Sequence, residues 1–533
     1  MARLNFMMPP LMATLFMMLA LTCLVVTGCD APQPDQNKPA QNKPNQNKPA
    51  QNKLVQNNPV LTETWDALLI SGSRVGQVHT VARSIVWQDE AAVRTEAQSS
   101  MRLKRFGTES LVHLTSACIE TSAEEVLALR YRMDMPGGSR DFEGEVSDDV
   151  LRYQVTSAGQ TRTHEMPWPR GTGGFFAVEQ SLRQNPMTPG ETRDLKKLEP
   201  MVDQIATWQL VAESWEEVPL LGGRFRLLRI RASQMLPDSN MKIDQTLWTN
   251  RDGEVLKAYT SSLDMELIRT TREIATSDHP VPQFDLGLDV VARLEQPLPG
   301  GHNTTYAEYE LTLESSDPTS VFPSGVSQQV RSAGANTVRL VVHAVRPDQP
   351  PAPDQPAIDA PSEPPTEADL GDSSLIQSGD PRIVEMAHSV ATDATEPWSV
   401  AIALESHVHR VVTKKNFSQV FASAAEVAQH REGDCTEHAV LLAALCRARG
   451  IPARVAIGLV YSPPAGGFLY HMWNEVWIAD RWVPLDATLG LGGIGAAHLK
   501  VTDTNLGGAS AYSSLLPILN VVGQLKVKVI EVR

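Results

Sequence analysis

The chain has 533 residues, of which 42% are hydrophobic and 20% charged, and its formal net charge is -15. The length predicts more than one domain, and the composition is typical of globular protein that can build sizeable cores. The acidic balance argues against a nucleic-acid-binding protein, which needs a basic surface to neutralise phosphates. We therefore interpret the charge as solvation of the surface and expect no nucleic-acid partner.

The first residues resemble the signal peptide of a bacterial lipoprotein. Arg3 supplies a positive charge, residues 11–26 form the apolar stretch LMATLFMMLALTCLVV, and the segment VTGC ends at Cys29. In that family the leader is cleaved before the cysteine and the thiol is acylated, so residues 1–28 are the expected signal peptide and Cys29 the expected lipidation site. The alternative is an uncleaved membrane anchor, because the apolar stretch is close to the length that spans a bilayer. Both interpretations predict an exported protein held at a membrane of the bacterial envelope.

The next segments differ clearly in composition. Residues 29–60 repeat the motif QNKP, which cannot bury a core and predicts an extended tether. In residues 61–277, short runs rich in Val, Leu, Thr, Tyr and Trp alternate with Gly, Asp, Asn and Ser, which predicts a large antiparallel β-rich domain. Residues 278–346 form a second strand-rich segment, and residues 347–372 a Pro-rich, acidic linker or exposed loop.

The pattern becomes helical in residues 373–533, where the segment REGDCTEHAVLLAALCRARG begins at Arg431. Asp434 suits a helix N-cap, and the run after it is apolar on every side, which predicts a fully buried helix. Cys435 lies in the first turn, where the positive end of the helix dipole favours thiolate over thiol. Cys446 follows about three turns later in apolar surroundings, so we expect an inert core thiol there.

A thiolate nucleophile needs a base, and the base needs a group that orients it. Three strand-like runs follow the helix, VAIGLVYS, FLYHMWNEVWI and RWVPLDAT, with His471 early in the second and Asp486 late in the third. A short turn would fold the last two into a hairpin, so that the start of one strand lies beside the end of the next. We therefore expect Asp486 to hold one imidazole nitrogen while the other faces Cys435. Trp473 and Trp477 are candidates to line the cleft of the site, but aromatic residues on a strand are more often core, and we interpret them so.

Together these blocks resemble the signature of the transglutaminase-like superfamily, which has a papain-like cysteine fold. The resemblance covers residues 380–488 and rests on three blocks in the right order. It implies that Cys435 is the nucleophile, His471 the general base and acid, and Asp486 the orienting carboxylate. The expected fold class is α+β: a C-terminal transglutaminase-like (papain-like) domain with a central helix packed on an antiparallel sheet and a C-terminal strand, preceded by large antiparallel β-rich domains.

The implied activity is thiol-dependent acyl transfer on amide bonds of a protein or peptide substrate. Cys435 attacks the carbonyl, backbone N–H groups at the helix start hold the oxyanion, and His471 protonates the leaving amine. Water as acceptor gives protease-like or amidase-like hydrolysis, which we favour, and an amine gives transamidation, the reaction of a protein-glutamine gamma-glutamyltransferase. A catalytically silent peptide-binding or scaffold lipoprotein is the alternative outside the enzymes.

We expect neither a cofactor nor a metal. A zinc site formed by Cys435, His438, His471 and Asp486 is a rival, but structural zinc sites prefer paired cysteines at short spacing, which the sequence lacks. Calcium dependence, familiar from animal transglutaminases, has no support because no Asp-x-Asn-x-Asp-Gly loop with a distal Glu occurs. A second oxyanion donor is not identifiable, and Gln429 is only a weak candidate.

Overall fold

The computed structural model describes residues 58–533 apart from several gaps. The gaps are residues 137, 158, 201, 237–241, 262–263, 279–283, 314–316, 347–362, 391–393, 415–421, 508–515, 520 and 522. The expected signal peptide, Cys29 and most of the expected tether and linker therefore lie outside the described residues. In the part that is described, no helix is both long enough and apolar enough to cross a membrane.

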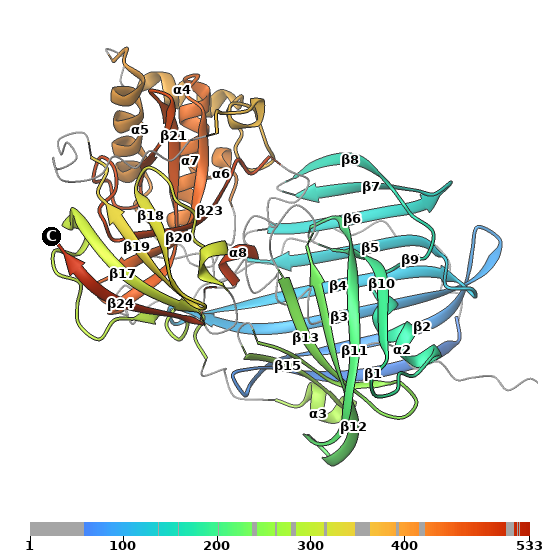
Figure 1. The fold of residues 1–533 in the computed structure, drawn as a ribbon. Helices are drawn as coiled ribbons and strands as arrows, with labels where there is room; N and C mark the ends of the chain where they lie inside the picture. Colours follow the sequence, from blue (N-terminus) through green and yellow to red (C-terminus); the bar gives the residue numbers. More distant parts are fainter. Residues whose placement is uncertain are drawn as a thin grey trace, which may run out of the picture.

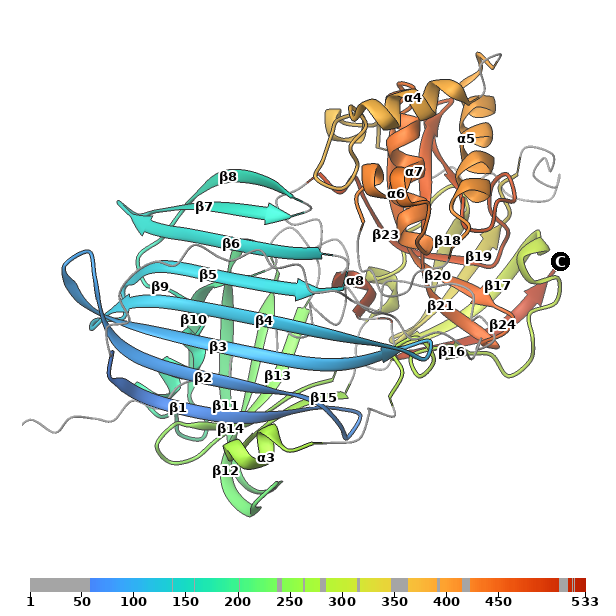
Figure 2. The same ribbon diagram turned by 180° about the vertical axis from the view of Figure 1, so that it is seen from behind.

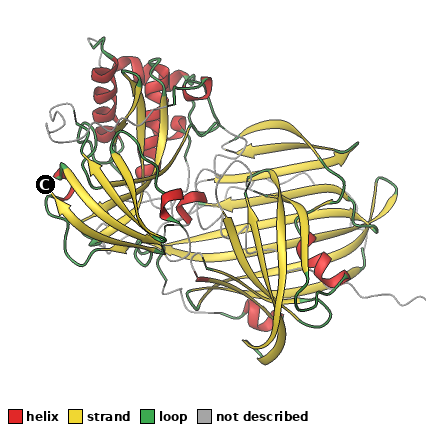
Figure 3. Ribbon diagram, in the orientation of Figure 1, coloured by secondary structure: helices red, strands yellow, loops and turns green. Residues whose placement is uncertain are grey.

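The fold is mostly β, so the expected α+β class is wrong. Strands take up 53% of the described residues and helices 17%. Figure 3 shows that most of the helices gather in one part of the molecule, while strands form the rest. The reason is that the period-two alternation of strands persists through the whole first half. Between β1 and β15 the described chain contains only one short helix, α2 (Ala177–Gln184).

One 15-stranded sheet fills this first half of the chain. Its order is β8-β7-β6-β5-β4-β3-β2-β1-β15-β14-β13-β12-β11-β10-β9, so two runs of neighbouring strands meet where β1 pairs with β15. In Figures 1 and 2 the strands β1 to β8 form one curved layer, and strands of the second run cross it steeply. The strands are β1 (Val60–Ile70), β2 (Ser73–Trp87), β3 (Glu90–Arg105), β4 (Thr108–Thr121), β5 (Val126–Met135), β6 (Gly138–Ser147), β7 (Val150–Ser157), β8 (Gln160–Pro167), β9 (Thr172–Gly173), β10 (Thr192–Glu199), β11 (Gln204–Leu220), β12 (Gly223–Met235), β13 (Lys242–Thr249), β14 (Val255–Thr260) and β15 (Met265–Thr270). The short helix α3 (Arg272–Thr276) follows.

Alternation along the strands gives this sheet its core. In β5, Leu129, Tyr131 and Met133 are buried, whereas the arginines between them are exposed. The core also contains charge: Arg140 donates a hydrogen bond to Asp203 at 2.6 Å, and both side chains are buried. Removal of either partner would leave an uncompensated buried charge, so the two residues stabilise the core only as a pair.

A four-stranded sheet joins the middle of the chain to its end. The order β18-β19-β17-β24 places the last strand, β24 (Leu525–Val532), beside β17 (Tyr306–Leu313). The other two strands are β18 (Gln328–Gly334) and β19 (Thr337–His343), and short 3-10 turns occur at Gly301–Asn303, Pro318–Ser320 and Glu367–Asp369. The last strand of the chain therefore pairs with residues that lie about 220 positions earlier in the sequence.

The third sheet carries the helices. Its order is β16-β21-β20-β23, with β22 also paired to β21. Helix α7 packs against β20 and β21, and α4, α5 and α6 pack against α7, so almost every residue of α7 is buried. The elements are β16 (Ala292–Arg293), α4 (Pro381–Ser389), α5 (Pro397–Val411), α6 (Ala424–His430), α7 (Cys435–Ala448), β20 (Ala453–Ser462), β21 (Gly467–Ile478), β22 (Arg481–Leu485), β23 (His498–Thr504) and α8 (Leu516–Leu519).

The large sheet is attached to this part through the turn between β3 and β4. The buried carboxylate of Asp285 accepts hydrogen bonds from the backbone N–H groups of Phe106 and Gly107, both at 2.8 Å. The chain then runs to β16, which pairs with the first residues of β21. Strand β21 also carries His471, so the segment that contacts the large sheet at Asp285 continues directly into β16, which pairs with the strand of the candidate site.

Candidate active site

Cys435 is the first residue of α7, and its neighbours fix that position. The Asp434 side chain accepts a hydrogen bond from the N–H of Thr436 at 2.9 Å, and the Glu437 side chain accepts one from the N–H of Asp434, also at 2.9 Å. Gly433 has a φ of 153°, which favours glycine, and a Cβ there would meet the Glu437 side chain. The helix therefore begins at the cysteine, whose side chain is fully buried.

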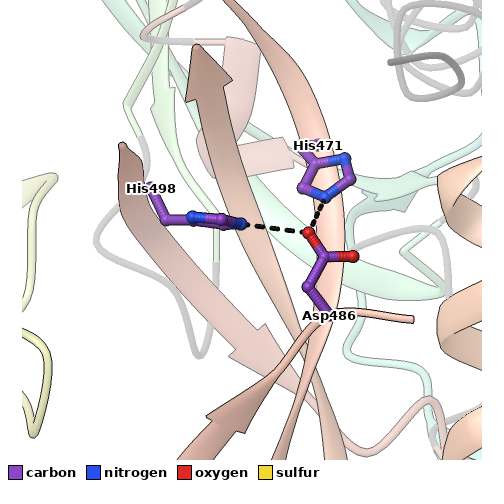
Figure 4. Close-up of side chains that lie close together, drawn as sticks. All are labelled: His471, Asp486 and His498. Atoms are coloured by element: carbon purple, nitrogen blue, oxygen red, sulfur yellow. Dashed lines mark hydrogen bonds and ion pairs between the residues drawn. The ribbon is translucent and has the colours of Figure 1, made fainter. Parts of the chain in front are cut away.

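The hairpin of β21 and β22 brings His471 and Asp486 together. The pairing runs from Ile478 and Arg481 at the turn to Asn474 and Leu485. Nε2 of His471 lies 2.7 Å from Oδ2 of Asp486, and both side chains are fully buried (Figure 4). Two residues that are 15 positions apart are thus in direct contact, as the hairpin interpretation requires.

His471 is poised between Asp486 and Cys435. Burial lowers the pKa of His471, but the charge and hydrogen bond of Asp486, together with the hydrogen bond and charge of Cys435, outweigh burial and raise the pKa to about 10. The second ring nitrogen, Nδ1, is buried and has no nitrogen or oxygen partner among the described residues. The geometry therefore leaves Nδ1 for the sulfur. A cationic imidazole beside a thiol favours the thiolate.

Asp486 is held as an anion from both sides. Its Oδ1 accepts hydrogen bonds from the N–H groups of Thr488 at 2.8 Å and Leu489 at 3.4 Å. Its Oδ2 faces His471 and also His498, whose Nε2 lies 3.0 Å away. Burial raises the pKa of Asp486, but the charge of His471 and the hydrogen bonds of both histidines hold it well below its usual range. The carboxylate can therefore stabilise a cationic His471 without taking its proton.

Sequence reasoning missed His498, the first residue of β23. Only the path of the chain between β22 and β23 places this residue beside Asp486, and no spacing rule predicts that path. Trp473 is part of the core, as predicted, with 2% exposure, whereas Trp477 is half-buried. The Trp473 ring, however, also stacks on His471 with centroids 6.0 Å apart and meets the edge of His498 at 5.3 Å. The tryptophan thus packs against both imidazoles.

Glu405 of α5 is a second residue that the sequence did not indicate. Its Oε1 accepts hydrogen bonds from the N–H groups of Asp486 and Gly493, both at 3.3 Å, and the side chain is 1% exposed. Burial is the main cause that raises its pKa to about 8, and the charge of Asp486 acts in the same direction. The raised pKa favours the neutral acid at pH 7, in which form Glu405 supports the backbone of Asp486 without adding a second negative charge.

Other residues considered from the sequence lie elsewhere. Gln429 is exposed, and its side-chain oxygen accepts a hydrogen bond from Arg382 at 3.0 Å, so the structure does not place it as an oxyanion donor. His438 is buried with Nδ1 2.5 Å from the backbone oxygen of Asp434. Cys446 is confirmed as a core thiol by its full burial, which also raises its pKa to about 12.

A metal could be held by a different set of ligands from that considered in the sequence. The ligand atoms of His471, Asp486 and His498 all lie within 4.8 Å of one another, and this is the group of metal-binding type found among the described residues. Neither Cys435 nor His438 belongs to it. Two imidazoles and a carboxylate suit zinc. In the structure, however, the same atoms already satisfy one another as hydrogen-bond donors and acceptor.

The candidate site is closed to solvent. Cys435, His471 and Asp486 are each 0% exposed. A surface cavity of about 660 Å³ lies instead over β2 and β3, and none of these three residues lines it. The Cys435 sulfur is therefore not in contact with solvent in this structure.

Comparison with known families bears on this part of the chain. Residues 384–487 match the model of the transglutaminase-like superfamily. This segment is a transglutaminase-like domain. The match contains Cys435, His471 and Asp486 and ends before His498. No curated protein matches the chain.

Three solved structures are similar to the chain at low identity. A candidate cysteine protease from Cytophaga hutchinsonii is 16% identical with a TM-score of 0.24, over 43% of this chain and 86% of that one. A β-barrel-like protein of unknown function from Brucella abortus is 9% identical with a TM-score of 0.29, over 39% and 95%. A candidate protease from Parabacteroides distasonis is 11% identical with a TM-score of 0.18, over 69% and 68%. At such low TM-scores these similarities carry no argument.

Proposed function

We propose that the protein is a thiol-dependent acyl-transfer enzyme that acts on amide bonds of proteins or peptides. The observation that supports this most is the contact of His471 with Asp486 at 2.7 Å on one side and with the Cys435 sulfur on the other. All three residues lie within the transglutaminase-like domain. In this proposal Cys435 is the nucleophile, His471 the general base and acid, and Asp486 the group that orients the imidazole.

The proposed reaction begins with the Cys435 thiolate, which attacks the amide carbonyl carbon while the carbonyl oxygen takes up the negative charge. The positive end of α7 and its first N–H groups stabilise that oxyanion. The C–N bond then breaks as His471 gives the proton on Nδ1 to the leaving amine, and a thioester remains on Cys435. A water or amine loses a proton to His471, attacks the thioester and releases the thiolate.

We favour water as the acceptor, which makes the enzyme a hydrolase of the protease or amidase type, because water needs no second binding site. Transamidation is the other outcome. One incubation separates the two. Full-length protein in detergent is mixed with an unfolded protein substrate and a labelled primary amine, and the products are read by mass spectrometry. Hydrolysis predicts new peptide termini or deamidated glutamines without label, whereas label on glutamine side chains would show transamidation.

Two cysteine variants make this test specific. Cys435→Ala should abolish every product, because no other group in the proposal forms the thioester. Cys446→Ala is the matched control, since it removes a thiol from the same helix at a position that we regard as inert. Loss of products in both variants, or in neither, would argue against the proposal and leave the peptide-binding alternative.

We also propose that the enzyme is exported and held at a membrane by lipid on Cys29. The resemblance of the first 29 residues to a lipoprotein signal supports this. The repeated QNKP segment that follows would separate the lipid from the folded part of the chain.

A further inference from the structure

His498 lies across the Asp486 carboxylate from His471, outside the residues that match the family model (Figure 4). Both histidines point Nε2 at the same oxygen, Oδ2 of Asp486, at 2.7 Å and 3.0 Å. All three side chains are at least 99% buried. A buried carboxylate oxygen with two imidazole partners has little freedom to rotate, because each contact fixes the direction of the oxygen.

The two imidazoles differ in their protonation. Burial lowers the pKa of His498, although its contacts with Asp486 and with the backbone oxygen of Gly495 act the other way. A neutral imidazole carries one proton, and we assign it to Nε2, because Asp486 is charged and nearer than the Gly495 oxygen at 3.3 Å. His498 therefore donates a fixed hydrogen bond to Asp486, whereas His471 holds the proton that moves in the reaction.

Packing holds the arrangement in place. Trp473 lies two residues after His471 on β21, so both side chains project from the same face of the strand. Its indole stacks on His471 with an interplanar angle of 18° and meets His498 at 74°. One tryptophan and one carboxylate thus contact both imidazoles, which fixes the distance between the two rings.

We propose that His498 is a positioning residue that fixes Asp486 toward His471. The proposed site then consists of four residues: Cys435, His471, Asp486 and His498. The proposal rests on the function proposed above. Without the His498 donor, Oδ2 keeps only His471 as a partner. The N–H groups of Thr488 and Leu489 still hold Oδ1, but the carboxylate can then tilt about Oδ1 away from the best geometry for His471. His471 would then be held less firmly beside Cys435, and less of the sulfur would be thiolate at neutral pH.

Two neighbouring titratable groups do not change charge near pH 6, the point of the pH 5 to pH 9 profile at which the variants are compared. His302 lies with its ring centroid 6.5 Å from that of His498, and burial is the main cause that lowers its pKa to about 4. Glu405, which supports the Asp486 backbone, has its pKa raised to about 8. A difference in reactivity at pH 6 can therefore be assigned to the four residues of the proposed site.

The test compares His498→Leu with His498→Gln in the full-length protein. Leucine fills similar space without a donor, and glutamine places an N–H near the position of Nε2. The rate of alkylation of Cys435 by iodoacetamide is measured by mass spectrometry from pH 5 to pH 9 and expressed relative to the rate at pH 9. A chelator is present throughout, because the same side chains could bind a metal. His302→Leu is the control, because it removes a neighbouring imidazole that feels the charge of Asp486 but makes no hydrogen bond to that carboxylate in the described part of the chain.

We expect His498→Leu to shift the profile to higher pH by about one unit, which makes the relative rate at pH 6 about tenfold lower. His498→Gln and His302→Leu should stay close to wild type. Equal pH profiles for wild type and His498→Leu would overturn the proposal. The proposal would also fail if His498→Gln lowered the relative rate at pH 6 as much as His498→Leu does. A merely structural role would expose the buried thiol and raise alkylation at every pH. If wild-type Cys435 behaves as an ordinary thiol, the proposed function itself fails and the role of His498 fails with it.

Discussion

Oδ2 of Asp486 accepts hydrogen bonds from two histidines, and its 2.7 Å contact with Nε2 of His471 is the one that defines the candidate site. It joins the middle of β21 to the end of β22 in a fully buried position. Because a buried carboxylate interacts strongly with a nearby imidazolium, this contact raises the pKa of His471 and favours its cationic form, which can stabilise a thiolate.

Asp486→Asn should keep the shape of this contact and remove its charge. The imidazolium then loses its main stabilising partner, so the pKa of His471 falls and Cys435 is less often a thiolate. We expect turnover to fall by roughly 10²–10⁴-fold, as expected when an orienting carboxylate of a triad is neutralised. Turnover of an amide substrate measures this, with thermal unfolding to show that the fold is retained. Turnover within a factor of about three of wild type would contradict the assigned role, since one pKa unit alone changes a population tenfold.

Glu405 should make stability depend on pH. Its pKa is raised to about 8 in the folded state and is about 4.3 in an unfolded chain, so the folded state binds the proton more tightly between these values. Stability contributed by the protonated carboxyl is therefore lost as the pH rises from about 4.3 to 8. Glu405→Gln cannot ionise, and we expect its unfolding temperature to fall less than that of wild type over this interval.

A second substitution at the same position separates charge from hydrogen bonding. Glutamine keeps an oxygen that can accept the N–H groups of Asp486 and Gly493, whereas leucine does not. Glu405→Leu should therefore lower both stability and turnover, while Glu405→Gln keeps turnover near wild type. An equal loss of turnover in both variants would show that the ionisable carboxyl itself is needed.

Cys29 should determine where the protein is found in the cell. Cys29→Ser removes the acylated thiol, so we expect an unlipidated protein that leaves the membrane fraction or retains its uncleaved leader. Fractionation of a bacterial host and the intact mass of the purified protein measure this, with Cys23→Ser, inside the expected leader, as the control. A different result would indicate a transmembrane anchor instead. In that case both proteins keep the leader and stay in the membrane fraction, and the mass of wild type shows no lipid.

Local patterns in the sequence predicted the parts of the site that depend on neighbouring residues. The N-cap at Asp434 and the apolar run after it place Cys435 at the start of α7, and a short turn places Asp486 beside His471. His498 and Glu405 could not be predicted in this way. They reach Asp486 through the route of a long loop and the packing of α5, which depend on the whole fold.

The fold class shows the same limit on a larger scale. Alternation identified strands in the first half of the chain, but it could not show that they continue as one 15-stranded sheet. Pairing of β24 with β17 is likewise a long-range contact that no local motif encodes. The helical segment around Cys435 predicts α+β, but it is a small share of a molecule that is mostly β.

The pH dependence of alkylation at each cysteine, in wild type and in His471→Ala, tests the central claim most directly. We predict that Cys435 of wild type reacts well below pH 8 and that this advantage disappears in the variant. Cys118 and Cys446 serve as internal references, because all three cysteines are buried and burial is the main cause that raises the pKa of the Cys118 and Cys446 thiols, whereas Cys435 lies beside His471. Cys118 and Cys446 should stay slow in both proteins. If Cys435 instead reacts as an ordinary thiol with a pKa of about 8.5 in both proteins, His471 does not activate it, and the proposed enzyme mechanism is wrong.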